Sequence, residues 1–262
     1  QSVRRKEIPK GNGKTRPLGI PTIMDRLIQQ CVLQVMEPIC EAKFCETSNG
    51  FRPNRGVENA LAQAEKHMQK SNLHIVIDID IKGFFDNVNH GKLLRQIWTM
   101  GIHDKKLLSI ISAMLKAEVA GIGFPEKGTP QGGILSPLLS NIVLNELDWW
   151  ITSQWVGMPT RHEYSGKIHE NGTKDQSKKY RELRKTNLKE CYIVRYADDF
   201  NIFCRKHSDA VKLFEATRAW LKERLGLDIS PEKSKIVNLK HAYSDFLGFR
   251  IKVHKGINHK IC

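Results

Sequence analysis

The sequence lacks three features that would place it in common classes of protein. It has no apolar run of the roughly 18 residues that a membrane-spanning helix needs, and no secretory signal opens it. Its six cysteines include no Cys-x-x-Cys pair, so neither a disulfide framework nor a zinc site is indicated. We therefore expect a reduced protein of the bacterial cytoplasm, with an organelle as the alternative, and no membrane partner.

Acidic residues are too few to balance the basic ones. The chain has 262 residues, with 42 Lys and Arg against 28 Asp and Glu, which gives a formal net charge of +14. This excess favours a polyanionic partner, nucleic acid before membrane, over a merely basic soluble protein. A hydrophobic content of 40% is enough to bury a core in one large domain or two smaller ones.

A complete phosphate-binding loop is also missing. Gly13, Lys14 and Thr15 match the end of that motif, but the motif needs a glycine five positions before Gly13, where Ile8 stands. We therefore exclude a nucleotide hydrolase of this type. The glycines of this basic segment instead predict a turn between two short extended pieces.

Hydrophobic periodicity predicts the secondary structure of the rest of the chain. Helical spacing predicts helices over 25–45, 56–70, 104–118, 136–153 and 208–225. Alternation predicts a strand over 75–81. Apolar runs on both sides of a tight turn predict a hairpin of buried strands over 191–204, and a further strand is predicted over 246–253. The polar segment 157–190 predicts a mobile or extended insertion. This order indicates an α+β fold with a small antiparallel sheet backed by helices.

Aspartates interrupt two of the predicted strands. Asp198 and Asp199 stand side by side between apolar runs, and Asp78 and Asp80 lie on one face of "HIVIDIDI". Charges in apolar surroundings are costly unless something neutralises them. If both strands share a sheet, Asp80, Asp198 and Asp199 converge, and Mg²⁺ is the hard cation that such oxygens prefer. Two solvated turn aspartates are the alternative, which the apolar flanks disfavour.

Six segments, in the same order along the chain, resemble blocks of the group II intron-encoded reverse transcriptases, or maturases. They are GKTRPLGIPTIMDRLIQ, GFRPNRG, DIDIKGFFDNVNH, GTPQGGILSPLLSNIVLNELD, YADDF and FLGF. The resemblance implies the fingers and palm of a right-hand polymerase. It assigns 1–70 and 88–135 to the fingers, and 71–87 and 136–262 to the palm, with 157–190 as an insertion.

The helical thumb of that family follows the last palm strand, whereas this chain stops at Cys262. We therefore expect a reverse transcriptase domain fragment from which the thumb is absent.

The resemblance also implies an activity and the residues that carry it. The activity is RNA-directed DNA synthesis, in which two Mg²⁺ ions, replaceable by Mn²⁺, add dNTPs to a DNA primer on an RNA template. The implied catalytic and metal-binding residues are Asp80, Asp198 and Asp199, with the backbone carbonyl of Ile81 as a further metal ligand. The implied dNTP-binding residues are Lys10, Arg16, Phe85 and Gln131. The implied primer and template contacts are Arg4, Tyr196, Leu247 and Gly248.

Two of these roles leave neighbouring residues to be distinguished. Phe85 matches the aromatic that packs under the sugar and excludes a 2′-hydroxyl, whereas Phe84 is expected in the core. Either Lys233 or Lys235 could protonate the departing pyrophosphate, and the sequence leaves that choice open.

Other functions are compatible with the same resemblance. It implies binding of group II intron RNA to assist splicing and mobility, and in one alternative that binding is the main function and polymerisation is secondary. An RNA-dependent RNA polymerase is a third hypothesis, which the bulky Phe85 disfavours. A homodimer is also compatible with this family.

Overall fold

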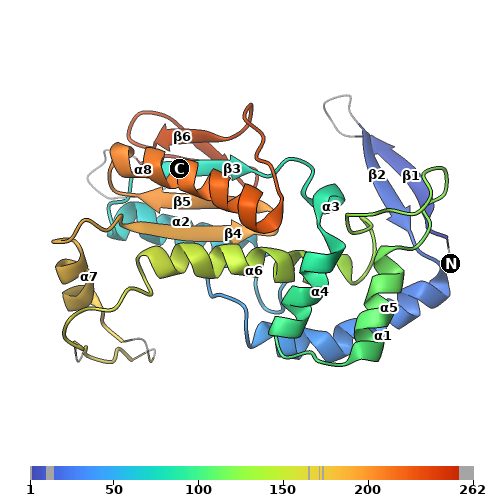
Figure 1. Ribbon diagram of the computed structural model, residues 1–262. Coiled ribbons are helices and arrows are strands. Elements are labelled where there is room, and N and C mark those ends of the chain that lie inside the picture. The colour runs from blue at the N-terminus through green and yellow to red at the C-terminus, as the bar shows by residue number, and fades with distance from the viewer. Residues whose placement is uncertain (1, 10–14, 165, 171, 173, 254–262) are drawn as a thin grey trace.

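The computed structural model describes residues 2–9, 15–164, 166–170, 172 and 174–253 (Figure 1). Its strands are β1 (Arg4–Pro9), β2 (Thr15–Ile20), β3 (Ile75–Asp80), β4 (Cys191–Tyr196), β5 (Asp199–Cys204), β6 (Lys235–Asn238), β7 (Ser244–Phe246) and β8 (Phe249–Ile251). Its helices are α1 (Ile23–Glu41), α2 (Val57–Glu65), α3 (Phe84–Asn87), α4 (His90–Thr99), α5 (Lys105–Leu115), α6 (Ser136–Gln154), α7 (Ser177–Leu183) and α8 (His207–Trp220). Two π-helical turns, η1 (Lys66–Lys70) and η2 (Leu221–Leu225), continue α2 and α8.

The centre of the molecule is a four-stranded antiparallel sheet in the order β4-β5-β3-β6. The isoleucines of β3 at 75, 77 and 79 point to one face and are buried in the main core with residues of α6 and α8. Figure 1 shows α8 in front of the sheet, α2 behind it and α6 below β4. This arrangement confirms the predicted α+β fold with a small antiparallel sheet backed by helices.

Helix α2 covers one end of the opposite face of the sheet. Ala60, Ala64 and Met68, at four-residue spacing, pack with Val194 and other apolar residues of the strands, and Phe246 and Ile251 of the β7–β8 hairpin pack on the same face. Residues at this spacing lie on one side of a helix. The segment 1–70 was assigned to the fingers, but α2 and η1 within it pack against the sheet. The other end of this face carries the aspartates.

A second part of the molecule lies to the right in Figure 1 and contains the β1–β2 hairpin, α1 and α5. The two extended pieces predicted around the glycines are β1 and β2, which pair antiparallel. The turn between them lies outside the described residues. The Gly19 N–H donates to the Gln131 carbonyl at 2.6 Å, so β2 is attached to the loop that precedes α6.

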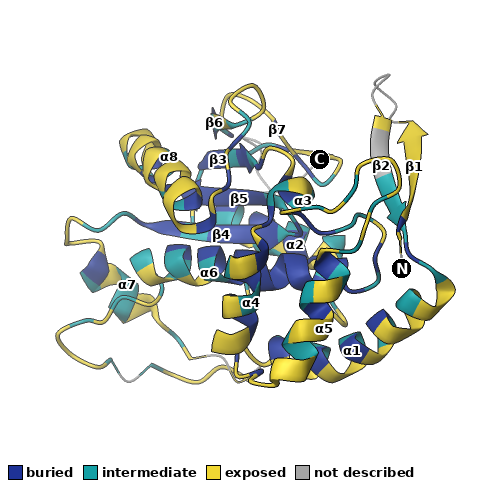
Figure 2. Ribbon diagram, turned by 45° about the vertical axis from the view of Figure 1, so that its right-hand side comes forward, coloured by how far each residue is buried: buried dark blue, intermediate teal, exposed yellow. Residues whose placement is uncertain are grey.

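Helix α6 connects the two parts of the molecule. It begins at Ser136, and Pro137 occupies its first turn, as predicted. Twelve of its residues are buried, five of them polar or charged, so α6 is enclosed by the fold on most of its sides (Figure 2).

Several elements differ from the prediction or were not predicted, among them the four-residue helix α3. The strand predicted over 246–253 is the hairpin β7–β8, because Leu247 and Gly248 have positive φ values of 54° and 83° that reverse the chain. The insertion 157–190 contains α7, which is only seven residues long. Helix α4 was missed because polar His90 and Gln96 are among its buried residues. Strand β6 was missed because it has only four residues.

No described helix is both long enough and apolar enough to cross a bilayer.

Candidate active site

The sheet register places aspartates from two strands opposite each other. Asp80 is the last residue of β3 and pairs with Asp199, the first residue of β5. Two steps along each strand, Asp78 pairs with Asn201. Directly paired residues of antiparallel strands point to the same face, with Cβ atoms about 5 Å apart. The carboxylates of Asp78, Asp80 and Asp199 therefore share the face that α2 leaves uncovered.

Asp198 comes from the turn that joins β4 to β5. Tyr196 pairs with Asp199, so only Ala197 and Asp198 form this turn. Ala197 has a φ of +57°, a value that residues with a Cβ rarely adopt. Asp198 is half-buried, and its charge acts on the neighbouring Asp199 carboxylate. The turn thus adds a third carboxylate beside the pair formed by β3 and β5.

Burial makes two of these carboxylates hard to ionise. Burial, followed by the charges of Asp78, Asp198 and Asp80, raises the pKa of Asp199 from 3.8 to about 6, although the Leu247 N–H donates to this carboxylate. Burial also raises the pKa of Asp78 to about 6, against the opposing charge of Lys235. Negative charge at this end of the sheet is therefore incompletely compensated by the protein.

Two lysines approach two of the aspartates, Lys233 from the segment before β6 and Lys235 from the first position of β6. Lys233 Nζ lies 3.2 Å from each carboxylate oxygen of Asp80. Lys235 Nζ is 3.9 Å from Asp78 Oδ2. The two lysines thus approach different aspartates: Lys233 contacts Asp80, the implied metal ligand, and Lys235 lies nearer Asp78.

The residues of this cluster suit a divalent cation by their chemistry. Among the described residues, no three His, Cys, Asp or Glu side chains are already gathered in a metal-binding arrangement. The ammonium group of Lys233 contacts Asp80, and like-charged carboxylates repel each other in the absence of an ion. The available donors are nonetheless all oxygens, as Mg²⁺ prefers, and a nearby cation would favour the ionised form of Asp199, whose pKa burial and the neighbouring carboxylates raise.

Ile81 follows Asp80 and is also placed to contribute. Ile81 pairs with Ile229 in an antiparallel bridge. The hydrogen bonds of this bridge are made by the flanking residues: Ser230 N–H donates to the Asp80 carbonyl, and Lys82 N–H donates to the Asp228 carbonyl. Ile81 is therefore in a non-hydrogen-bonded pair. Its own carbonyl therefore points away from that segment, toward the side of β5. This orientation is consistent with the metal-binding role that the resemblance implies.

We expect Asp199 to contribute stability to the metal-free protein that is lost as the pH rises from about 4 to about 6. The folded pKa of Asp199 lies above its value of 3.8 in a free chain, so this group binds more protons in the folded state over this interval. Other groups act in the opposite direction there, among them His67, whose pKa burial lowers to about 4, so the test is the comparison between variants. In thermal unfolding measured in chelator, the slope of stability against pH should be more negative in the wild type than in Asp199→Asn, and it should be unchanged in the exposed variant Asp228→Asn. Added Mg²⁺ should stabilise the wild type more at pH 7 than at pH 5; equal slopes in all three proteins would contradict the prediction.

The two phenylalanines after β3 have different environments. Phe84 is only 2% exposed and belongs to the main core. Phe85 is half-buried, and its ring meets that of Phe84 edge-on at 5.3 Å. The Phe85 carbonyl accepts a hydrogen bond of 2.7 Å from the Thr129 N–H. Phe85 is therefore attached to the loop that contains Gln131, whose side-chain Oε1 is buried and has no hydrogen-bond partner among the described residues.

The remaining implied contacts are spread over both parts of the molecule. Tyr196 lies beside Asp199 on the same face of the sheet, and the Leu247–Gly248 turn reaches Asp199 through the Leu247 N–H. Arg4 is exposed on β1 and Arg16 lies on β2, in a hairpin that stands apart from the sheet (Figure 1). Lys10 lies outside the described residues. The structure thus gathers the palm residues and leaves Arg4 and Arg16 away from them.

A buried ion pair behind the turn was not predicted. Arg195 on β4 and Asp148 on α6 are both fully buried, and Arg195 Nη2 lies 2.6 Å from Asp148 Oδ2. Two signals were present in the sequence: an arginine inside the strand "CYIVRY" and an aspartate inside the apolar helix "IVLNELDWW". Each charge in such surroundings requires a partner.

Comparisons with known proteins agree with this arrangement. The chain is 34% identical over 258 residues to "Protein YkfC" of Escherichia coli K12, covering 95% of this chain and 66% of that protein. It is 35% identical over 295 residues to the "Group II intron-encoded protein LtrA" of Lactococcus lactis subsp. cremoris, covering 98% and 48%. The chain therefore spans about half to two thirds of the length of these relatives.

The fold is also that of a solved polymerase structure. Apo telomerase from Candida tropicalis matches with a TM-score of 0.64 at 15% identity, over 96% of this chain and 46% of that one. At this identity the likeness concerns the fold alone. The family described as "Reverse transcriptase (RNA-dependent DNA polymerase)" matches residues 8–251. This match, which covers most of the chain, and the similarity to an intron-encoded protein confirm the resemblance inferred from the six sequence segments: the chain belongs to the reverse transcriptase family.

Proposed function

We propose that this chain catalyses RNA-directed DNA synthesis as part of a group II intron-encoded reverse transcriptase. The observation that carries the proposal is the pairing of Asp80 with Asp199 in the sheet, with Asp198 in the adjoining turn. Reverse transcriptases use divalent metal ions, and we propose two Mg²⁺, replaceable by Mn²⁺, in this site. The fingers would comprise 1–70 and 88–135, and the palm 71–87 and 136–262.

Different residues of the chain would bind the metal ions and donate a proton during the reaction. Asp80, Asp198 and Asp199, with the Ile81 carbonyl, would hold the ions. When bound, the ions would activate the primer hydroxyl and stabilise the charge on the departing pyrophosphate. Lys233, which already contacts Asp80, would donate a proton to the pyrophosphate, and we prefer it to Lys235 because Lys235 faces Asp78.

Other residues would position the two substrates. Gln131 has a buried amide oxygen that a ligand donor could satisfy, and we propose that it contacts the incoming dNTP. Lys10 and Arg16, the latter on β2, would bind the triphosphate. Tyr196 and the Leu247–Gly248 turn would hold the primer end, and Arg4 would contact the RNA template.

Primer extension tests this proposal directly. The protein is supplied with a DNA primer on an RNA template and with either dNTPs or rNTPs, in Mg²⁺ and in chelator. We expect extension with dNTPs and Mg²⁺ only. Extension with rNTPs at equal efficiency would favour an RNA polymerase, and binding of the primer–template without any extension would favour the RNA-binding alternative.

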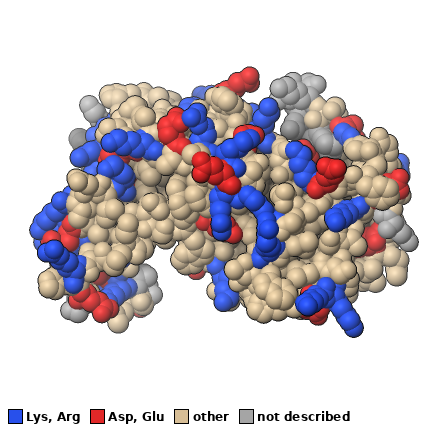
Figure 3. Space-filling view, in the orientation of Figure 1, with Lys and Arg blue, Asp and Glu red and all other residues tan. Residues whose placement is uncertain are grey.

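A second function, binding of group II intron RNA, is favoured by a separate observation. The insertion 157–190 carries nine Lys or Arg against five Asp or Glu, and Figure 3 shows basic side chains gathered around α7 at its lower left. Lys178 and Arg181 are exposed on this helix. We propose that this basic region contacts intron RNA outside the catalytic cluster and so assists splicing.

We expect loss of Lys178 and Arg181 to weaken RNA binding and to reduce its dependence on salt. Each lost phosphate contact should reduce the slope of log K against log salt by about 0.7 to 0.9. The measurement compares wild type with Lys178→Ala/Arg181→Ala on intron RNA over a range of salt concentrations. Lys212→Ala, an exposed lysine on α8, is the matched control. An unchanged slope in the double variant would show that this helix does not contact RNA.

A further inference from the structure

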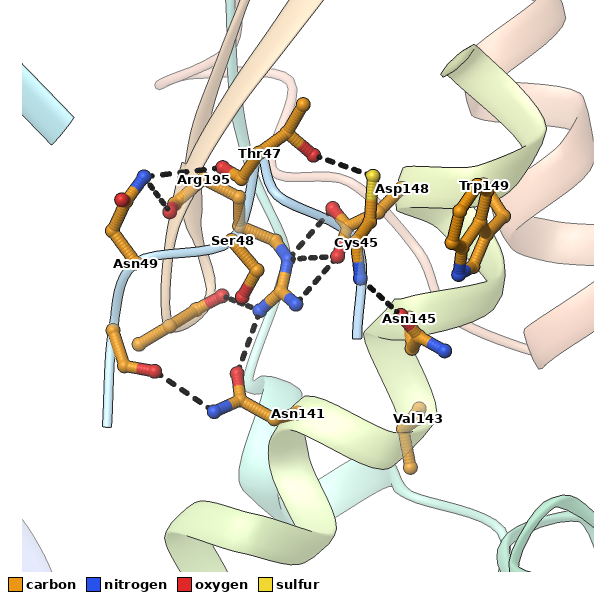
Figure 4. A network of polar contacts seen from close by, with 12 residues as sticks. Cys45, Thr47, Ser48, Asn49, Asn141, Val143, Asn145, Asp148, Trp149 and Arg195 are labelled. Carbon is orange, nitrogen blue, oxygen red and sulfur yellow. Dashed lines mark hydrogen bonds and ion pairs between the residues drawn. The ribbon is translucent and has the colours of Figure 1, made fainter. Parts of the chain in front are cut away.

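A buried polar network lies directly behind the turn that carries Asp198 (Figure 4). Arg195 and Asp148 are both 0% exposed. Arg195 Nε lies 2.9 and 3.0 Å from the two carboxylate oxygens of Asp148, and Nη2 lies 2.6 Å from Oδ2. A buried pair of this kind contributes little net stability relative to apolar residues of the same size. A function other than stability is therefore to be sought for it.

The other end of the guanidinium contacts the turn itself. Arg195 Nη1 donates to the Ala197 carbonyl at 2.8 Å and to Asn141 Oδ1 at 3.0 Å. Asn141 in turn donates to the Gly50 carbonyl at 2.8 Å. The Ala197 carbonyl belongs to the peptide bond that leads into Asp198. One planar group thus connects helix α6 with the peptide that carries a proposed metal ligand.

The backbone around this peptide is unusually constrained. Ala197 is in the left-handed region at φ +57°, which costs about 1 kcal/mol or more for a residue with a Cβ. A Cβ added at Gly50 would lie 2.3 Å from the Ala197 nitrogen, so the 47–50 loop packs directly against the turn. The same loop forms hydrogen bonds with both backbone groups of Arg195. The Asn49 N–H donates to the Arg195 carbonyl at 2.8 Å, and the Arg195 N–H donates to the Thr47 carbonyl at 2.9 Å.

We propose that Arg195, held by Asp148 and Asn141, is a positioning residue that orients the Ala197–Asp198 peptide and thereby sets the reach of the Asp198 carboxylate toward a divalent cation. Arg195 touches neither the ion nor the substrates and acts only through the Ala197 carbonyl. The inference rests on the proposed function, because it takes Asp198 to be a metal ligand. Groups that orient a metal ligand typically contribute 10- to 100-fold to metal affinity.

Arg195→Lys tests the inference while keeping a charge opposite Asp148. A lysine lacks the planar guanidinium with its several N–H donors, so it cannot hold the Asp148 carboxylate and the Ala197 carbonyl in the same geometry. The double variant Arg195→Met/Asp148→Leu removes both charges, an exchange that is often neutral for stability. Arg205→Met is the control, because Arg205 pairs with Glu190 at the far end of the hairpin.

The readout is binding of Mn²⁺ to the protein with primer–template and dNTP, measured by the loss of the free-ion EPR signal. A primer without a 3′-hydroxyl prevents turnover. We expect about a tenfold or greater rise in the Mn²⁺ dissociation constant for Arg195→Lys and for the folded double variant. Arg205→Met should lower the melting temperature and leave Mn²⁺ binding unchanged.

Asp198→Ala separates this inference from the function on which it rests. If Asp198→Ala weakens Mn²⁺ binding but Arg195→Lys binds Mn²⁺ like the wild type, the positioning role is overturned and the metal site stands. If Asp198→Ala itself binds Mn²⁺ like the wild type, the assignment of the metal ligand fails. A double variant that recovers both stability and wild-type Mn²⁺ binding would show that the pair is only structural.

Discussion

Asp198→Ala should abolish DNA synthesis while leaving RNA binding intact. The carboxylate of Asp198 stands beside Asp199, whose pKa is raised to about 6 by burial first and then by the neighbouring carboxylates, Asp198 among them. Removing one proposed metal ligand removes several kcal/mol of transition-state stabilisation, which corresponds to about a thousandfold in rate. Affinity for RNA comes mainly from Lys and Arg contacts to phosphates. It should therefore change little.

Two measurements on the same protein preparation check this expectation. Single-turnover primer extension gives the rate of the chemical step, and filter binding gives the affinity for the primer–template. Asp199→Ala should behave like Asp198→Ala. Asp228→Ala, an exposed aspartate that pairs with Lys222, should retain wild-type synthesis. Full synthesis by a folded Asp198→Ala would show that the active site has been placed wrongly.

Phe85→Val should admit ribonucleotides while keeping most DNA synthesis. Asp80 ends β3, and Phe85 follows five residues later, on α3, with its backbone attached to the loop that contains Gln131. If the sugar of the incoming nucleotide packs against this half-buried ring, as we propose, the ring would leave no room for an additional 2′-hydroxyl. Overpacking costs about 1 to 3 kcal/mol, and a hydroxyl without a partner costs about as much again. Together these effects could give discrimination on the order of a hundredfold or more.

Phe84→Val is the matched control for this prediction. Phe84 is only 2% exposed, so its truncation should leave a cavity and cost about 2 kcal/mol or more. That loss would lower the melting temperature by several degrees without a change in sugar selectivity. The measurement is the ratio of dNTP to rNTP incorporation efficiency for each variant. An unchanged ratio in active Phe85→Val, or a collapse of the ratio in Phe84→Val alone, would show that Phe85 is not the ring that excludes ribonucleotides.

The sequence by itself determined the class of fold and the strand and turn positions of the aspartates proposed for the palm site. Alternation in "HIVIDIDI" places Asp78 and Asp80 on one strand face, and the apolar flanks of "YADD" make a buried hairpin. Both signals are local, because strand periodicity depends only on neighbouring residues. The six segments identified the family from the sequence alone, because each is a short stretch of consecutive residues and their order along the chain can be read directly.

The tertiary structure decided what depends on contacts between distant segments. The register that sets Asp80 opposite Asp199 joins residues more than a hundred positions apart. The contact of Lys233 with Asp80 and the bond of Leu247 to Asp199 likewise depend on how β6 and β7 meet the sheet. The sequence showed that Arg195 would need a partner but not which one. Only the tertiary structure identified the partner as Asp148 on α6. A buried charge is neutralised by a group close to it in space, which can be far from it in the sequence.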